Sequence, residues 1–353
     1  MSLEDRVKEL AGEVVPADAS AVEAALERHG QLLKPPGSLG RLEDLGARLA
    51  GMAGASPQPV PGNPAVVVCA GDHGVLSRGI SPWPKEVTAT MVESFCSGGA
   101  AVNAIARTVG ARVSVLDVGV ASELDRHPLL RMAKVSHGTG DLSGGQAMSR
   151  EQAARAVLAG AGIAGELIES GGVDLLVTGD MGIGNTTPAA CLIAAFTGRP
   201  AREATGRGTG IDDATLEGKV RVVEGALDLH RPDPGDPIGT LAALGGLEHA
   251  ALAGLILSGA VYTTPVLLDG VVSNSAALVA QALAPNSVDY MIAGHLSTEP
   301  GARVALEHLG LEPLLDLRMR LGEGTGGLLA VPLVQAAARV LNEMATLKEA
   351  GMW

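Results

Sequence analysis

Glu323 has the surroundings expected of a catalytic carboxylate. It stands in the segment LGEGTGG, flanked by Gly322, Gly324, Gly326 and Gly327. A carboxylate without bulky neighbours is open to close approach by a flat substrate, and a dry pocket raises its pKa toward the range of a general base. Surface loops are the other usual place for a glutamate. Glu323 is therefore either a general base or an exposed loop residue.

The segment VTGDMGIGNTTPAA, residues 177–190, is a candidate anion site. An apolar run leads into Asp180, Gly182 and Asn185. A helix is expected to begin at Asn185, because Asn or Thr caps free backbone amides and Pro188 fits a first turn. Free amides and hydroxyls at a helix N-terminus bind anions. An ordinary strand-to-helix turn has the same residues, so both interpretations stay open.

A second loop of this kind is ATGRGTGIDDATLEGKV, residues 204–220. It offers Gly208 and Thr209 before a helix that Asp212 or Asp213 opens. Lys219 follows about two turns later in that helix. Its ammonium either neutralises a phosphate or is solvated on the surface, which is the commoner position for lysine.

A third loop, AGHLSTEPGARVALEHLG, places Ser297 and Gly301 before another predicted helix. His295 in this loop is either a packed or capping residue or a catalytic one. Upstream, AGDHGV and GISPWPKEVT contain another group of polar residues, namely Asp72, His73, Ser81 and Glu86. These residues either line the same pocket or tie down their own loop.

Several common nucleotide and metal chemistries lack their sequence signatures here. The glycine spacing does not match a dinucleotide GxGxxG, and no loop has the lysine of a P-loop. The acidic signature that holds diphosphoribose and magnesium in many phosphoribosyltransferases is absent. The eight histidines show no HxxxH or HExxH spacing and no cysteine cluster. The chain is therefore expected to bind a phosphate monoester, with no metal and no cofactor.

Composition excludes other partners. The net charge of -13 comes from 26 basic and 39 acidic residues, without a basic block, which argues against nucleic acid and anionic membrane as partners. Residues 250–261 form the most apolar stretch, and it is too short to span a bilayer, so a buried helix is expected. Three widely spaced cysteines and a polar N-terminus favour reduced thiols in a cytoplasmic protein.

The pattern of elements predicts an α/β fold. Two helices are expected near the N-terminus, the first opened by a capping box of Ser20 and Glu23 with an apolar rhythm that includes Leu26 and Leu33. After the linker ASPQPVPGNP, short apolar runs alternate with helical segments; these runs are AVVVCAGD, ARVSVLDVG, VDLLVTGD and VDYMIAG. Such alternation predicts a mostly parallel sheet flanked by helices, a Rossmann-like large domain, with ligands at the carboxyl ends of the strands.

A long C-terminal helix, VPLVQAAARVLNEMATL, is expected to return to the N-terminal helices. The predicted division is therefore a small helical domain from residues 1–60 plus 328–353, and an α/β catalytic domain from residues 61–327.

Taken in order, the segments resemble one family closely. They are KPPGSLGRLEDLGARLA, AGDHGV, GISPWPKEVTATMV, SGGAAVNAIAR, VLDVGV, GTGDLS, GDMGIGNTTPAA, GRGTGID, LLDGVVSNSAAL and RLGEGTGG. The chain resembles the nicotinate mononucleotide:5,6-dimethylbenzimidazole phosphoribosyltransferases of cobalamin lower-ligand synthesis. The resemblance implies a homodimer that moves ribose 5-phosphate from nicotinate mononucleotide to 5,6-dimethylbenzimidazole, giving α-ribazole 5'-phosphate and nicotinate.

The resemblance also implies roles for particular residues. It assigns Glu323 to catalysis and Ser81 and Leu321 to the base pocket. The residues that it implies for the nucleotide and its phosphate are Asp180, Gly182, Asn185, Gly208, Thr209, Lys219 and Ser297. The family pattern GEMGIGNTT has glutamate where this chain has Asp180, which shortens the reach of the carboxylate by one methylene.

Two other classes of function share parts of this pattern. A non-catalytic nucleotide-binding module would keep the loops but has no need of Glu323. A dinucleotide-dependent oxidoreductase on a similar sheet would need the GxGxxG motif after the first strand.

Overall fold

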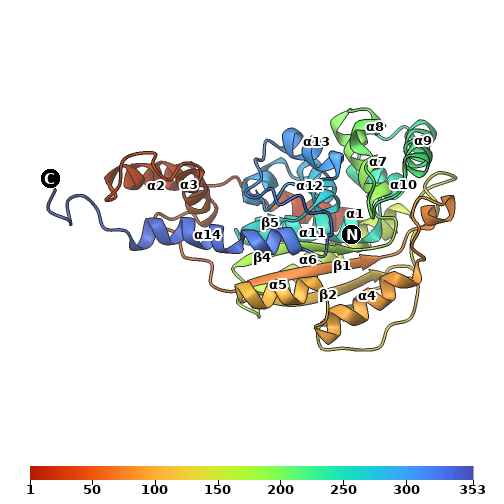
Figure 1. The fold of residues 1–353 in the computed structure, drawn as a ribbon, viewed down its shortest axis with the longest axis horizontal. Coiled ribbons are helices and arrows are strands. Elements are labelled where there is room, and N and C mark those ends of the chain that lie inside the picture. Colours follow the sequence, from red (N-terminus) through yellow and green to blue (C-terminus); the bar gives the residue numbers. More distant parts are fainter. Residues whose placement is uncertain (353) are drawn as a thin grey trace.

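The computed structural model describes residues 1–352, and within them a parallel six-stranded sheet lies at the centre (Figure 1). The strand order is β3-β2-β1-β4-β5-β6. The strands are β1 (Pro64–Gly71), β2 (Arg112–Gly119), β3 (Leu130–Met132), β4 (Leu175–Met181), β5 (Val266–Leu268) and β6 (Met291–Ala293). The predicted α/β class with a parallel sheet is confirmed.

The order in which the chain adds strands to the sheet reverses between β1 and β4. From β1 the chain adds β2 and β3 on one side, whereas β4, β5 and β6 extend on the other. In register, Cys69 pairs with Asp180 and Ala70 with Met181. The carboxyl ends of β1 and β4 therefore lie together at a topological switch point, where open α/β sheets bind their ligands.

Helices cover both faces of the sheet (Figure 1). The α-helices are α1 (Leu3–Gly12), α2 (Ala19–Gln31), α3 (Arg41–Ala53), α4 (Glu86–Ser97), α5 (Ala101–Val109), α6 (Arg150–Glu169), α7 (Thr186–Thr197), α8 (Ala201–Ala204), α9 (Asp213–His230), α10 (Pro237–Leu244), α11 (Leu247–Val261), α12 (Val271–Leu283), α13 (Pro300–Leu309) and α14 (Thr325–Glu343). Two 3₁₀ helices are η1 (Gly74–Arg78) and η2 (Pro285–Tyr290). Helices α6, α11 and α12 pack on one face, and α4, α5 and α14 on the other.

Glycine allows the tightest helix contact, between α6 and α11. A Cβ on Gly160 would lie 1.8 Å from the carbonyl oxygen of Ala251, and one on Gly254 would lie 1.8 Å from that of Val157. No larger residue fits either position without separating the two helices. The predicted buried helix at residues 250–261 is confirmed as part of α11, whose residues are buried almost throughout.

Helices α2 and α3 lie beside the C-terminal half of α14, away from the sheet (Figure 1). A small apolar cluster joins them, formed by Ala25, Ala47, Ala50 and Leu341. Helix α1 instead packs against α6 and α11. The division into residues 1–60 plus 328–353 and residues 61–327 stays a prediction.

Several local predictions are wrong. Asp18, not Ser20, caps α2, because its carboxylate accepts the N–H groups of Ser20 and Ala21. Leu26 is exposed, and Leu33 is exposed and lies beyond the end of α2.

Two helix boundaries also differ from prediction. Gly301 lies inside α13 and not before it. Helix α14 begins at Thr325 and runs through Pro332, so its N-terminus directly follows Glu323. Among the described residues, no helix is both long enough and apolar enough to cross a membrane.

Candidate active site

A cavity of about 430 Å³ opens where the carboxyl ends of the strands meet. All ten residues to which the resemblance assigns a role lie on its lining, which brings together loops from distant parts of the chain. They are Ser81, Asp180, Gly182, Asn185, Gly208, Thr209, Lys219, Ser297, Leu321 and Glu323. The loops therefore form one site, and the structure supports a shared role for these residues.

Glu323 is buried in this cavity, with 4% of its surface exposed. It is not on the surface, which removes the alternative of an exposed loop residue. One carboxylate oxygen accepts the backbone N–H of Val102, in the first turn of α5, at 3.1 Å. Burial raises the pKa of Glu323, the nearby carboxylate of Asp269 adds to the rise, and the Val102 N–H partly opposes it. A raised pKa makes this carboxylate a better proton acceptor near neutral pH.

The backbone at Glu323 has a left-handed conformation, with φ of 63°. This region disfavours side chains with a Cβ and costs about 1–2 kcal/mol for a residue other than glycine. The Glu323 N–H donates to the Asp180 carbonyl at 3.2 Å. A Cβ on Gly179 would lie 2.7 Å from the Glu323 carbonyl oxygen, so the loop lies directly against β4. The strain is consistent with a carboxylate retained for function.

Asp269 holds the loop that carries Glu323, a role that the sequence does not reveal. Its buried carboxylate accepts the N–H groups of Gly324, Gly326 and Gly327 at 3.2, 2.7 and 3.0 Å. These donors belong to the N-terminus of α14, which would otherwise leave them without partners. Asp269 therefore fixes the direction in which the segment leaves Glu323.

Asp180 lies at the end of β4, buried beside the same loop. Its carboxylate accepts the side-chain N–H of Asn185 at 2.9 Å, and a Cβ on Gly322 would lie 3.2 Å from it. Burial, together with the charges of Asp269, Glu248 and Glu323, raises the pKa of Asp180 to about 8. Asp180 is therefore mostly protonated at neutral pH and can donate a hydrogen bond to a ligand.

We call one part of the cavity lining the lysine wall, formed by Thr186, Gly208, Lys219 and Glu299. The Lys219 Nζ donates to the Thr186 hydroxyl at 2.7 Å and to the Gly206 carbonyl at 3.0 Å. Lys219 is 2% exposed, so the alternative of a solvated lysine is wrong. Burial lowers its pKa to about 8, although Glu299 opposes the shift. The Glu299 carboxylate accepts the Gly208 N–H at 2.8 Å and so fixes the loop beside the ammonium.

Two arginines add positive charge near this wall. Arg207 and Arg320 both line the cavity, and Arg320 donates to the Gly208 carbonyl at 2.7 Å. Ser297 is buried, and its hydroxyl accepts the Glu299 N–H at 3.3 Å. The sequence predictions did not include Thr186, Glu299 or the two arginines, although all four stand within or next to the recognised loops.

We call a second, apolar part of the lining the tryptophan wall, formed by Ile80, Trp83, Val87 and Met91. Val87 and Met91 lie one turn apart on α4, and Trp83 precedes that helix. Trp83 is 52% exposed, which is unusual for so large an apolar side chain. The wall therefore offers apolar surface to a ligand.

The remaining polar candidates have different positions. His295 lines the cavity, whereas Asp72, His73 and Glu86 are absent from its lining. The Asp72 carboxylate accepts the Ala121 N–H at 2.7 Å, so it ties down its own loop. Of the four residues Asp72, His73, Ser81 and Glu86, Ser81 alone lines the cavity.

The whole chain is similar to known phosphoribosyltransferases. A family model described as phosphoribosyltransferase matches residues 14–352. A nicotinate-nucleotide–dimethylbenzimidazole phosphoribosyltransferase of Salinispora tropica is 53% identical over 351 residues, covering 96% of each chain. One of Chloroflexus aggregans is 54% identical over 337 residues, covering 96% of this chain and 95% of the other. The crystal structure of CobT from Thermus thermophilus superimposes with a TM-score of 0.91 at 48% identity, covering 95% of this chain and 99% of that one.

Proposed function

Because this chain belongs to the nicotinate-nucleotide–dimethylbenzimidazole phosphoribosyltransferases, we propose that it transfers ribose 5-phosphate from nicotinate mononucleotide to 5,6-dimethylbenzimidazole in the cavity, with Glu323 as general base. The products are nicotinate and α-ribazole 5'-phosphate, the precursor of the cobalamin lower ligand. The observation that carries the catalytic part of this proposal is the buried Glu323 carboxylate on the same cavity as Lys219.

The chemistry divides between leaving group and nucleophile. The ring nitrogen of nicotinate mononucleotide is already cationic, so its bond to C1' breaks without protonation. One nitrogen of the neutral benzimidazole attacks C1' from the opposite face, with inversion. The other ring nitrogen then carries a proton that must leave, and Glu323 accepts it before passing it to solvent. The enzyme thus needs a base but no general acid.

The lysine wall suits the phosphate of the nucleotide. An ammonium held by Thr186 and Gly206 supplies charge, and the N-terminus of α7, which lines the cavity at Asn185 and Thr186, adds the positive end of its dipole. Asp180, protonated near neutral pH, avoids the repulsion that a carboxylate would exert on an anionic ligand.

The tryptophan wall suits the flat apolar base. Trp83 and Leu321 both expose apolar surface to the cavity, and Ser81 lies between Ile80 and the tryptophan in sequence. Apolar contact discriminates poorly among related bases, since one methyl group is worth about 1–3 kcal/mol. Holding base and ribose in line can supply about 7–11 kcal/mol of the barrier reduction in favourable cases.

Release of nicotinate tests the proposal. Purified protein is mixed with nicotinate mononucleotide and 5,6-dimethylbenzimidazole, and nicotinate and α-ribazole 5'-phosphate are followed by chromatography. Equal amounts of both products are expected, and neither is expected without the base. Nucleotide binding without any turnover would instead indicate a binding module. A homodimer and a cytoplasmic location form part of the same proposal, and sedimentation of the purified protein tests the dimer.

A further inference from the structure

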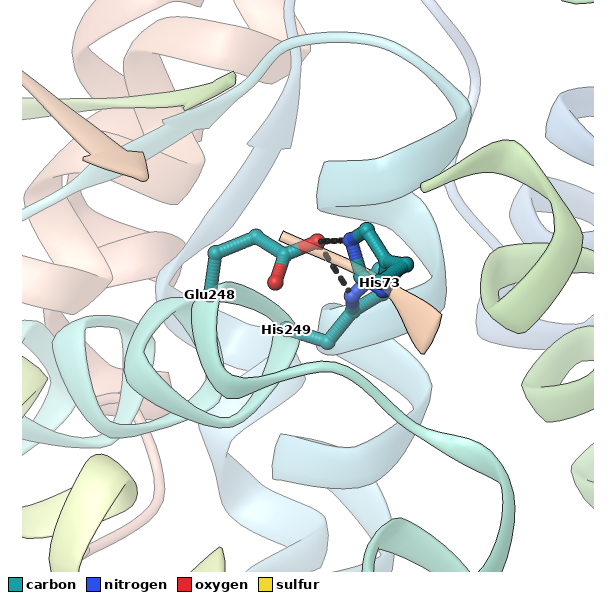
Figure 2. Close-up of side chains that lie close together, drawn as sticks. All are labelled: His73, Glu248 and His249. Atoms are coloured by element: carbon teal, nitrogen blue, oxygen red, sulfur yellow. Dashed lines mark hydrogen bonds and ion pairs between the residues drawn. The ribbon is translucent and has the colours of Figure 1, made fainter. Parts of the chain in front are cut away.

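A second group of chemistry-bearing side chains lies outside the cavity lining. His73 follows β1, and Glu248 and His249 stand in the first turn of α11. Figure 2 shows the two histidine rings and the carboxylate converging from these elements. One atom from each residue lies within 4.8 Å of the others. Their side chains are 1%, 0% and 0% exposed, so the group is enclosed by protein.

Hydrogen bonding alone leaves this group poorly satisfied. The His73 Nε2 lies 2.7 Å from the Glu248 Oε1, as expected for a hydrogen bond. The His249 Nδ1 lies 2.9 Å from the same oxygen but is not aligned for a hydrogen bond. The buried atoms left without a partner are His73 Nδ1, Glu248 Oε2, His249 Nδ1 and His249 Nε2. Buried polar atoms nearly always have a partner, so four unmet atoms in three residues require an explanation.

The backbone of Gly246 lies directly against this group. A Cβ on Gly246 would lie 2.6 Å from the Glu248 Oε2 and 2.6 Å from the His249 Nδ1. It would also lie 2.5 Å from the His73 Cε1. Glycine at this position therefore allows the backbone to approach all three side chains, and a larger residue would displace them.

We propose that His73, Glu248 and His249 bind a divalent transition metal of the zinc class. Two imidazole nitrogens and one carboxylate oxygen are a donor set typical of zinc and its neighbours, whereas magnesium and calcium prefer oxygen ligands alone. The donor atoms lie within 4.8 Å of one another, and ligand atoms about 2.0–2.1 Å from a tetrahedral ion are about 3.3 Å apart. This inference departs from the expectation of no metal, because His73 and Glu248 are 175 residues apart and no local spacing connects them.

The position of the group indicates a supporting role. A Cβ on Gly182 would lie 3.1 Å from the His73 Nε2 and 2.3 Å from the Gly71 carbonyl oxygen. Gly182 in turn lines the cavity, so the metal would lie behind the loop proposed to hold the nucleotide. It would join the end of β1 to the start of α11, without touching substrate. Since the ligands are enclosed, the ion would enter during folding and stabilise the folded state.

Metal content of the intact protein tests the proposal. Tag-free wild-type protein is unfolded with a chelator and refolded with zinc, cobalt or manganese, and bound metal is measured by mass spectrometry after gel filtration. About one zinc or cobalt ion per chain is expected, with less manganese. The cobalt form should show the visible absorption of a four-coordinate ion. If the refolded wild-type protein holds no more metal than the buffer background with zinc, cobalt and manganese alike, the proposal is overturned. This result needs no variant.

Two variants locate the site. His249→Gln is expected to lower zinc affinity by at least about 10- to 100-fold and to abolish the rise in thermal stability that zinc gives the wild type. The matched control is His29→Gln, because His29 is also buried with both ring nitrogens unpartnered but lies in α2. It should keep the wild-type metal content. If His249→Gln does not fold, Glu248→Gln takes its place, and unchanged metal content in a folded variant of either residue would place the ion elsewhere and overturn the proposal.

Discussion

The lysine wall and the tryptophan wall of the cavity present different atoms to a ligand. On the first, Lys219 and Glu299 are buried and joined by hydrogen bonds to backbone atoms of the GRGTG loop. On the second, Trp83 is half exposed, and the surface is mainly carbon. The first is therefore preorganised for one charged group. The second, where we propose that the base binds, has apolar surface that a flat ligand would cover.

This contrast suggests how affinity and selectivity are divided. Charge-assisted hydrogen bonds from a fixed wall are directional and contribute about 1.5–3 kcal/mol each. Apolar contacts scale with buried area and tolerate changes in shape. We expect mutations on the lysine wall to act on one substrate strongly, and mutations on the tryptophan wall to act on the other weakly. A mutation of Glu323 should change the rate of the reaction and not the affinity for either substrate.

Glu323→Gln is expected to give the largest effect. General-base catalysis contributes about 10²- to 10⁴-fold, so kcat should fall by that factor while the affinity for nicotinate mononucleotide changes little. Stopped-flow or chromatographic rates, with the affinity from calorimetry, separate the two quantities. Glu307→Gln is the control, because Glu307 is an exposed glutamate on α13. A wild-type rate in Glu323→Gln would remove this residue from the role of base.

Lys219→Gln should follow. Loss of one charge-assisted bond to phosphate, about 1.5–3 kcal/mol, corresponds to roughly 10- to 150-fold in the affinity for nicotinate mononucleotide. The KM for the benzimidazole should stay close to the wild-type value. Initial rates with each substrate varied in turn measure both constants, and Lys8→Gln, at an exposed position on α1, is the control. Equal increases in both KM values would contradict the separation of the two walls.

Sequence reasoning recognised the lysine wall and missed most of the tryptophan wall, for a physical reason. Backbone-rich loops that bind phosphate need glycine, hydroxyl and helix-capping residues in one short segment, so GIGNTT and GRGTG stand out. The apolar residues of a helix that line a cavity have the same types and the same spacing as those that pack against a hydrophobic core. Val87 and Met91 therefore gave no signal of their own.

Contacts between segments that are far apart in the chain could not be predicted from the sequence either. Asp269 accepts N–H groups 55 to 58 residues away, and nothing near it in the chain indicates that partnership. Strand β5 consists of three residues, too few for a distinct pattern, and so does β3. The sheet class could be predicted because β1, β2 and β4 are long apolar runs.

Asp269→Asn tests whether the loop between the walls must be fixed. Its three N–H partners would face a neutral oxygen and an amide donor, so the free energy of unfolding should fall by about 1.5–3 kcal/mol. A misplaced Glu323 should lower kcat by about 10- to 100-fold with little change in nucleotide affinity. Denaturant unfolding and steady-state rates give the two values. Unchanged kcat in a destabilised protein would show that Asp269 serves stability alone.

The pH dependence of nucleotide binding should sharpen the contrast further. The pKa of Lys219 is about 8 in the folded protein without ligand, so its charge is present below that pH and is lost above it. Between pH 7 and 9 the KM for nicotinate mononucleotide should rise by up to about tenfold, as roughly nine-tenths of the lysine becomes neutral. Asp180, with a pKa of about 8, gains negative charge over the same range. In Asp180→Asn the part of the rise due to Lys219 should persist, whereas Lys219→Gln should lose that part.

Trp83→Ala should give the smallest effect and act on the other substrate. Stacking of an aromatic ring on a flat base contributes about 0.5–1.5 kcal/mol, which corresponds to roughly 2- to 12-fold in the KM for the benzimidazole. The affinity for nicotinate mononucleotide should not change, because Trp83 belongs to the apolar wall and the phosphate is proposed to bind at the lysine wall. Steady-state rates with 5,6-dimethylbenzimidazole and with unsubstituted benzimidazole measure the effect. A loss of nucleotide affinity equal to that of Lys219→Gln would mean that the two walls do not bind separate substrates. A similar loss for both bases is expected, since the wall recognises area and flatness more than the methyl groups.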